Sequence, residues 1–170
     1  MSGGHRAARA ALLFFFPLAY STTAPGSDAR LDLETLPKER IVLETRASGR
    51  HDYRAWRADT PDRRASGLMY VARLDDDQAM IFLYEEPQVV SMWMKNTYLP
   101  LDMLFVDARG CIVNIAEQTR PLSLKSIQSG SPVVLVVEIK GGGTAARGAK
   151  IGDRVLRPEA AWPSPGGGPC

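Results

Sequence analysis

The residues best suited to chemistry lie in one polar corner between two apolar segments. Trp93, Lys95, Asn96 and Thr97 end the first segment, and Asp102 lies near the start of the second. A carboxylate in apolar surroundings is costly to bury unless it is paired, and Lys95 lies on the other side of a turn, where it could meet Asp102. An indole next to polar groups suits a sugar ring or another planar ligand. The corner therefore predicts a binding pocket.

A structural interpretation of the same corner stays open. Asn96 and Thr97 could satisfy the backbone of the turn, and Asp102 could cap free amides while Lys95 pairs with it at the surface. Trp93 could equally pack in the core.

Two residues outside the corner join the candidate site. Glu138 interrupts a run of valines. It could be an acid with a shifted pKa at a functional site, or it could lie at the exposed end of a strand. With Asp102 it could form the acid/base pair of a hydrolase or lyase. Arg64 lies on a short predicted helix and could reach either acid, which a structural ion pair would also explain.

Other kinds of site lack their residues. The two histidines, His5 and His51, are too few for a histidine-rich zinc site, and no C-x-x-C pair is present. The glycines at 141–143 lack the Lys-Ser/Thr of a phosphate-binding loop. Methionines 69, 80, 92, 94 and 103 fall in apolar runs, so we interpret them as core side chains rather than copper ligands. We predict no metal or cofactor, and the missing enzymatic motifs favour a binding protein over an enzyme.

The composition is that of an ordinary globular domain, with 45% hydrophobic and 24% charged residues in 170. The net charge of +2 comes from Arg6 and Arg9, so the chain beyond residue 21 holds 19 basic and 19 acidic residues. A neutral domain has no general field that attracts nucleic acid or an anionic membrane. The partners we expect are therefore a small molecule, a glycan or an envelope protein.

The ends of the chain predict export. Arg6 and Arg9 precede an apolar run at 10–20 that is too short to span a bilayer but typical of a signal peptide. We expect residues 1–21 to be a signal peptide or, if uncleaved, a membrane anchor, and 22–39 a flexible linker. Residues 40–156 form the predicted domain, and 157–170 a disordered Gly/Pro tail. The two cysteines, Cys111 and Cys170, could form a disulfide in an exported protein, but their pairing stays open.

The apolar pattern predicts a mainly β fold. Strands are expected at 40–45, 51–58, 79–84, 89–94, 101–106, 111–116 and 133–139, with a last strand after 151 and a long loop at 117–131. Thr60, Pro61 and Gly67 are the cap, first residue and stop of a short helix, and 144–147 a helical turn. Short strands without long crossover helices favour one mostly antiparallel β-sandwich or barrel, jelly-roll-like, with one or two short helices.

A family resemblance adds to this prediction. It rests on the following motifs: Arg64 with Gly67-Leu68-Met69; Met80-Ile81-Phe82; Trp93-Met94-Lys95-Asn96-Thr97 with Leu101-Asp102; Pro121; Val137-Glu138-Ile139; Gly143; and Gly152-Asp153-Arg154-Val155. Over residues 40–155 the chain resembles DUF192 (UPF0127), a family of exported prokaryotic proteins of unknown function. The resemblance implies a compact β domain in the periplasm or cell envelope and no particular reaction. Two departures stand out: Ala79 replaces a usual glycine, and residues 54–58 lack an acid that members tend to carry, so no role of that acid is carried over.

Three functions follow from these observations. The first is a non-enzymatic module that binds a ligand, glycan or protein at the corner from Trp93 to Asp102. The second is an enzyme that uses Asp102 and Glu138. The third is a purely structural interaction domain.

Overall fold

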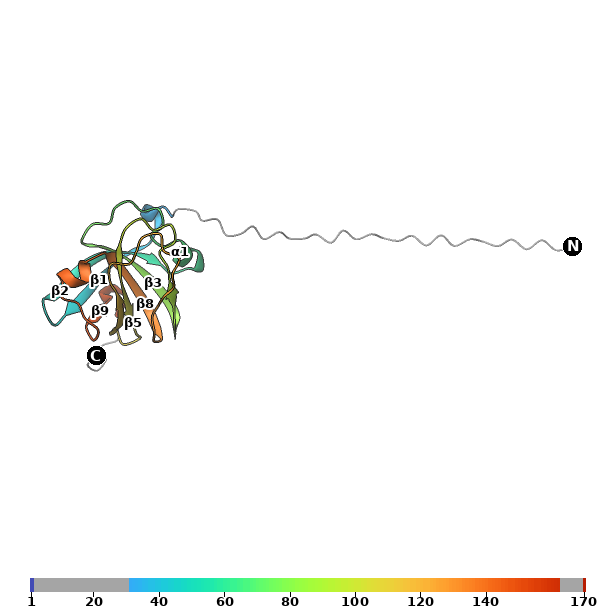
Figure 1. Cartoon of the computed structure of the whole chain (residues 1–170). Coiled ribbons are helices and arrows are strands. Elements are labelled where there is room, and N and C mark those ends of the chain that lie inside the picture. Colours follow the sequence, from blue (N-terminus) through green and yellow to red (C-terminus); the bar gives the residue numbers. More distant parts are fainter. Residues whose placement is uncertain (2–30, 163–169) are drawn as a thin grey trace.

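Strands dominate the computed structural model, which describes Met1, residues 31–162 and Cys170 (Figure 1). In the described chain, seven strands form one sheet in the order β6-β5-β8-β3-β2-β1-β9, and two very short strands, β4 and β7, form a ribbon. Their bounds are β1 Lys38–Thr45, β2 Gly49–Ala58, β3 Gln78–Gln88, β4 Ser91–Met92, β5 Leu101–Val106, β6 Ile112–Ala116, β7 Ile127–Gln128, β8 Val133–Lys140 and β9 Arg154–Leu156. The helices are α1 Pro61–Ser66 and α2 Gly143–Ala146, with 3₁₀ turns η1 Leu33–Thr35 and η2 Pro158–Ala160. The prediction of a mainly β fold with short helices is confirmed.

Helix α1 begins and ends where the sequence predicts. The Thr60 side chain accepts a hydrogen bond from the Arg63 amide at 3.3 Å, and Pro61 occupies the first turn. Gly67 follows with a φ of +48°, a conformation that costs glycine little. The helix lies in the connection between β2 and β3, which pair in parallel, while the other pairs are antiparallel. A parallel pair needs such a crossover connection, and the β2–β3 pair is the parallel exception in the predicted mostly antiparallel sheet.

The seven-stranded sheet curls until its two edges meet. Cys111, just before β6, bridges to Arg154 in β9, and the Ile112 amide donates to the carbonyl of Asp153 at 2.9 Å. The concave face holds a cluster of buried residues from all seven strands: Ile41, Leu43, Tyr53, Ala55, Ala79, Ile81, Leu104, Val106, Ile112, Leu135, Val137, Ile139 and Val155, with Ala149. We call this cluster the inner core.

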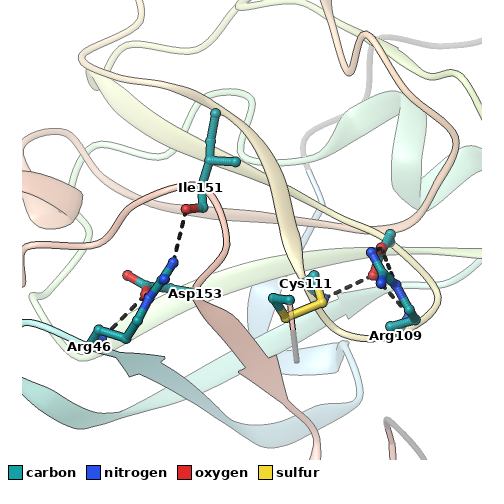
Figure 2. The surroundings of a disulfide bond; sticks show 7 residues. Arg46, Arg109, Cys111, Ile151 and Asp153 are labelled. Atoms are coloured by element: carbon teal, nitrogen blue, oxygen red, sulfur yellow. Dashed lines mark hydrogen bonds and ion pairs between the residues drawn. A yellow bond between two sulfur atoms is a disulfide. The ribbon is translucent and has the colours of Figure 1, made fainter. Parts of the chain in front are cut away.

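A disulfide lies at the same seam. Cys111 is buried and bonds to Cys170, with 5.5 Å between their Cα atoms and a sequence separation of 59. Figure 2 shows it near Asp153, whose carboxylate pairs with Arg46 at 3.1 Å. The bond ties the last residue of the chain to the edge where the sheet closes.

The opposite face of the sheet carries an outer core. It joins Met80, Met103 and Phe105 of the sheet to Met92 and Met94 of the covering segments. These four methionines are buried in this apolar cluster, as the sequence interpretation expected of core side chains, and Met69 is buried outside it. Helix α1 and the chain at 68–74 and 90–101 therefore cover this face. In Figure 1, α1 lies at the side of the sheet near β3.

Several predicted boundaries differ from the structure. The expected strand at 89–94 shrinks to Ser91–Met92 because its neighbour, in the expected loop at 117–131, pairs with it only at Ile127–Gln128. Strand β1 begins inside the expected linker, and η1 precedes it. The expected tail is ordered through residue 162, because Arg157 pairs with Glu39 and bridges to Trp162. The predicted leader at 2–21 and the tail at 163–169 lie outside the described residues.

No helix in the described part of the chain is long and apolar enough to cross a membrane.

Candidate functional site

Asp102 is a structural carboxylate. It is fully buried on β5 and accepts hydrogen bonds from the amides of Gln118 (2.7 Å), Gly142 (3.0 Å) and Thr144 (2.8 Å), and from the Thr144 hydroxyl (2.5 Å). Hydrogen bonds from several amides stabilise a buried carboxylate. Asp102 thereby holds α2 and the loop after β6 against the end of the sheet, as the structural interpretation predicts.

Asp102 and Glu138 lie on opposite faces of the sheet. Asp102 is paired with Ile139, an inner-core residue, whereas Glu138 is paired with Met103 and Met80 of the outer core. Directly paired residues share a face, and consecutive residues of a strand alternate between faces. The predicted acid/base pair is therefore wrong, because the sheet itself separates the two carboxyl groups.

Asn96 and Thr97 build the turn. Asn96 has a φ of +53°. Its side-chain Nδ2 donates to the Tyr70 hydroxyl at 2.7 Å, and its backbone carbonyl accepts from the backbone amide of Tyr70 at 2.8 Å. The Thr97 hydroxyl donates to the carbonyl of Lys95 at 3.1 Å. Asparagine tolerates this left-handed conformation better than most residues. These contacts hold the backbone of the corner in one conformation. The side chains of Trp93 and Lys95 take no part in them.

A cavity of about 210 Å³ lies between α1, β3 and the corner. Its lining includes five of the predicted site residues, which are Arg64, Trp93, Lys95, Thr97 and Glu138. The structure thus brings together five of the seven predicted site residues, and leaves Asn96 and Asp102 outside the cavity lining. Asp102 does not line this cavity, so the expected meeting of Lys95 with Asp102 is replaced by a cavity that Lys95 shares with Glu138.

Glu138 is the least ordinary member of the lining. Only 4% of its surface is exposed, on a strand whose other residues are apolar except for the final lysine. Burial raises the pKa of this carboxyl from 4.5 to about 8. At neutral pH the acid is therefore mostly protonated and can donate a hydrogen bond into the cavity.

Two cationic side chains line the same cavity from other elements. Arg64 of α1 donates to the carbonyl of Leu83 at 2.9 Å, and its guanidinium lies 5.1 Å from the centre of the Tyr84 ring. The Lys95 ammonium lies 5.7 Å from the centre of the Trp93 ring. Both contacts are within cation–π range. They orient the two cations and both aromatic rings along the cavity wall.

Trp93 is 48% exposed and lines the cavity, so the alternative in which it packs in the core is wrong. Its neighbours Met92 and Met94 are buried, because successive residues of an extended segment point to opposite sides. The alternation places Trp93 on the outside, where it lines the cavity.

Sequence reasoning missed the apolar walls of the cavity. Met69, Phe82, Tyr84 and Met92 line it together with Gly67, where a Cβ atom would approach the Phe82 ring to 3.1 Å. Gly67, which the sequence analysis used only as the end of the helix, could have indicated this wall. A glycine with positive φ lets the backbone approach an aromatic ring closely. Burial raises the pKa of Tyr84, against the opposite influence of Arg64.

Within residues 31–162 and the two described ends, no group of three or more His, Cys, Asp or Glu is placed to hold a metal ion.

The comparisons with known proteins agree with this architecture. The model of the DUF192 family, described as "Uncharacterized ACR", matches residues 42–156, and the chain belongs to this family. A "putative transcription regulator" from Sinorhizobium meliloti 1021 is 41% identical, with a TM-score of 0.71, over 72% of this chain and 95% of its own. A protein of unknown function from Novosphingobium aromaticivorans DSM 12444 is 34% identical, also with a TM-score of 0.71, over 75% of this chain and 91% of its own. No curated protein matches the chain.

Proposed function

We propose that this chain is an exported, non-enzymatic domain of the cell envelope that binds a small molecule in the cavity beside Glu138. One observation carries the proposal: a carboxyl that is 4% exposed lines a cavity of about 210 Å³ on an otherwise apolar strand. Burying such a group weakens the fold unless a ligand or partner uses it. A leucine at this position would pack better, so the acid is best explained by what enters the cavity.

The size of the cavity limits the ligand. Drug-sized molecules occupy pockets of roughly 300 Å³ or more, and 210 Å³ corresponds to about seven water volumes. Trp93, Tyr84 and Phe82 give the wall apolar faces that suit a ring. A single sugar unit or a small organic acid fits these limits, whereas a long polymer would engage the site only through one terminal unit.

Export is supported by two features. The basic and apolar N-terminal pattern is that of a signal peptide, and the bond between Cys111 and Cys170 is stable in an oxidising compartment. The meeting of the two sheet edges at Cys111 and Arg154 supports a barrel over a sandwich for the same domain. Contact with the membrane would come through the N-terminal segment if it stays attached.

Nucleic acid is not among the partners we propose. The described basic side chains are largely paired with acids, for example Arg54 with Asp77 and Arg157 with Glu39. Paired charges leave little field to attract phosphate. The regulator description of the Sinorhizobium protein is therefore not extended to this chain.

A protein partner is the second candidate. Large apolar side chains are exposed next to the cavity, at Trp93, Tyr98, Leu122 and Leu124. The Leu122 amide donates to the carbonyl of Thr97 at 3.1 Å, and the Met94 amide to that of Ser123 at 2.9 Å, so the two segments run side by side. An exposed apolar rim of this kind is typical of an interaction surface.

The test is ligand retention by the full chain purified from the envelope fraction of an expressing bacterium. We expect native mass spectrometry to show a bound small molecule in the wild type and none in Glu138→Leu, which folds because leucine suits the apolar site. Lys140→Ala is the matched control, because Lys140 ends the same strand but pairs with Asp76 outside the cavity. Equal retention in wild type and Glu138→Leu, or retention in neither, would contradict the proposal.

The same sample tests export and the disulfide. The intact mass should correspond to a chain without its first 21 residues and lower by 2 Da for one disulfide. A full-length, reduced chain in the cytoplasmic fraction would contradict the proposed location.

A further inference from the structure

We infer that the ligand of the Glu138 cavity is a small organic anion, whose charged group pairs with Arg64 while its other end accepts a hydrogen bond from Glu138. The inference rests on the proposed function and adds the chemical class of the ligand. It follows from three features of the cavity, namely its charge, the arrangement of its polar groups and its apolar wall.

The charge of the lining favours an anion. The ionisable side chains that line the cavity are Arg64 from α1, Lys95 from the corner, Tyr84 from β3 and Glu138 from β8. The only carboxyl among them is deeply buried, and burial raises its pKa to about 8. Tyr84 is neutral at pH 7, since burial raises its pKa further above 10. At neutral pH the lining therefore holds the positive Arg64 guanidinium and a mostly protonated carboxyl, so a cationic ligand would meet repulsion from Arg64.

The polar groups are arranged for a two-ended ligand. Glu138 is 96% buried between Met80 and Met103 and so offers its proton from the closed side. Arg64 uses one nitrogen for the Leu83 carbonyl, at 2.9 Å, and a guanidinium has further N–H groups that a carboxylate can accept in parallel. The Tyr84 ring beneath Arg64 holds its plane in place. An anionic group thus finds a pre-oriented fork, and a neutral oxygen finds a donor.

The wall between these two points is apolar and aromatic. Leu68, Met69, Phe82, Met92 and Trp93 line the cavity together with the two polar groups. With a volume of about 210 Å³, the cavity accommodates an acid with one ring or a short chain. The class is therefore a monoanionic acid with a compact apolar or sugar-like body and a second oxygen.

Binding should depend on pH through Glu138. Only the protonated carboxyl can donate to the ligand, and its protonated fraction falls from about 0.9 at pH 7 to about 0.1 at pH 9. The dissociation constant of an anion should therefore rise about tenfold between pH 7 and pH 9.

The experiment compares three probes of matched shape by calorimetry on the folded full chain. They are the 4-hydroxy derivatives of benzoate, benzamide and benzylamine, referred to below by these parent names, whose para oxygen supplies the acceptor for Glu138. A second pair, glucuronate and glucose, repeats the comparison on a sugar body. We expect each acid to bind at least tenfold more tightly than its neutral counterpart at pH 7, and benzylamine not to bind. Glu138→Gln should remove the pH dependence of acid binding, because an amide does not titrate between pH 7 and 9.

Arg64→Gln should lower acid affinity at least tenfold, and Arg64→Lys should restore part of it. Arg63→Gln is the matched control on the same helix, since Arg63 pairs with Asp59 at 2.6 Å and does not line the cavity. Tighter binding of glucose, benzamide or benzylamine than of the acids would overturn the anion class and leave the proposed function standing. If no probe binds and nothing co-purifies, both fail.

Discussion

The stability of the protein should depend on pH through one residue, Glu138. Its carboxyl has a pKa of about 8 in the folded chain, because burial disfavours the charged form, against 4.5 when exposed. Between pH 4.5 and pH 8 the Glu138 carboxyl is protonated in the folded state and ionised in the unfolded state. The stabilisation is therefore fully present below pH 4.5 and is lost as the pH rises through 8.

The size of the effect follows from the two pKa values. Proton linkage for this pair gives a loss of roughly 3–4 kcal/mol in the free energy of unfolding between pH 5 and pH 8. That loss is a large part of the 5–15 kcal/mol typical of a domain. Glu138→Gln cannot titrate, so its unfolding free energy should lack this component and should exceed that of the wild type at pH 8.

Urea unfolding followed by tryptophan fluorescence at pH 5, 6.5 and 8 measures the effect, and the difference between wild type and Glu138→Gln isolates this residue from other titrating groups. Glu86→Gln is the control, because Glu86 is exposed at the end of β3 and its substitution should leave the pH profile unchanged. A wild-type profile parallel to that of Glu138→Gln would refute the reasoning, since the acid would then be ionised or solvated in the fold.

Three further predictions concern the architecture. Asp102→Ala should lower the unfolding free energy by about 3–5 kcal/mol, because three backbone amides and a buried hydroxyl lose their acceptor. The control is Asp52→Asn, at a carboxylate that is 60% exposed, which should cost less than about 1 kcal/mol in the same urea titration. Gly67→Ala should cost about 1–3 kcal/mol through its positive φ and the Phe82 contact, and a change in thermal midpoint close to zero would contradict it. Replacing Cys170 by Ser should cost about 2–4 kcal/mol under non-reducing conditions, and a reductant should lower the wild type to the same level; insensitivity to reductant would show that the bond is not formed.

Local features were predictable because they depend on neighbouring residues. Thr60, Pro61 and Gly67 fixed helix α1 through capping and backbone preference alone. The β-branched run before Glu138 marked β8 as a buried strand. The family motif at Trp93 to Thr97 pointed to the right corner, and that segment does line the cavity.

The role of each acid was not predictable, because both lie in strands that are buried on both faces. Strand β5 is buried throughout, and β8 nearly so. Such strands lose the alternation of apolar and polar residues that tells the inner from the outer face. Asp102 and Glu138 therefore looked like partners, although the register places them on opposite sides of the sheet.

By itself, the sequence determined the β class, the helix ends, the signal-peptide pattern and the segment that carries the polar corner, since each of these depends on short-range preferences. Only the tertiary structure decided that Asp102 supports the fold, that Glu138 and Arg64 line one cavity, and that Cys111 bonds to Cys170. These outcomes depend on strand register and on the closing of the sheet. Both are set by contacts between residues far apart in the chain, which no local pattern encodes.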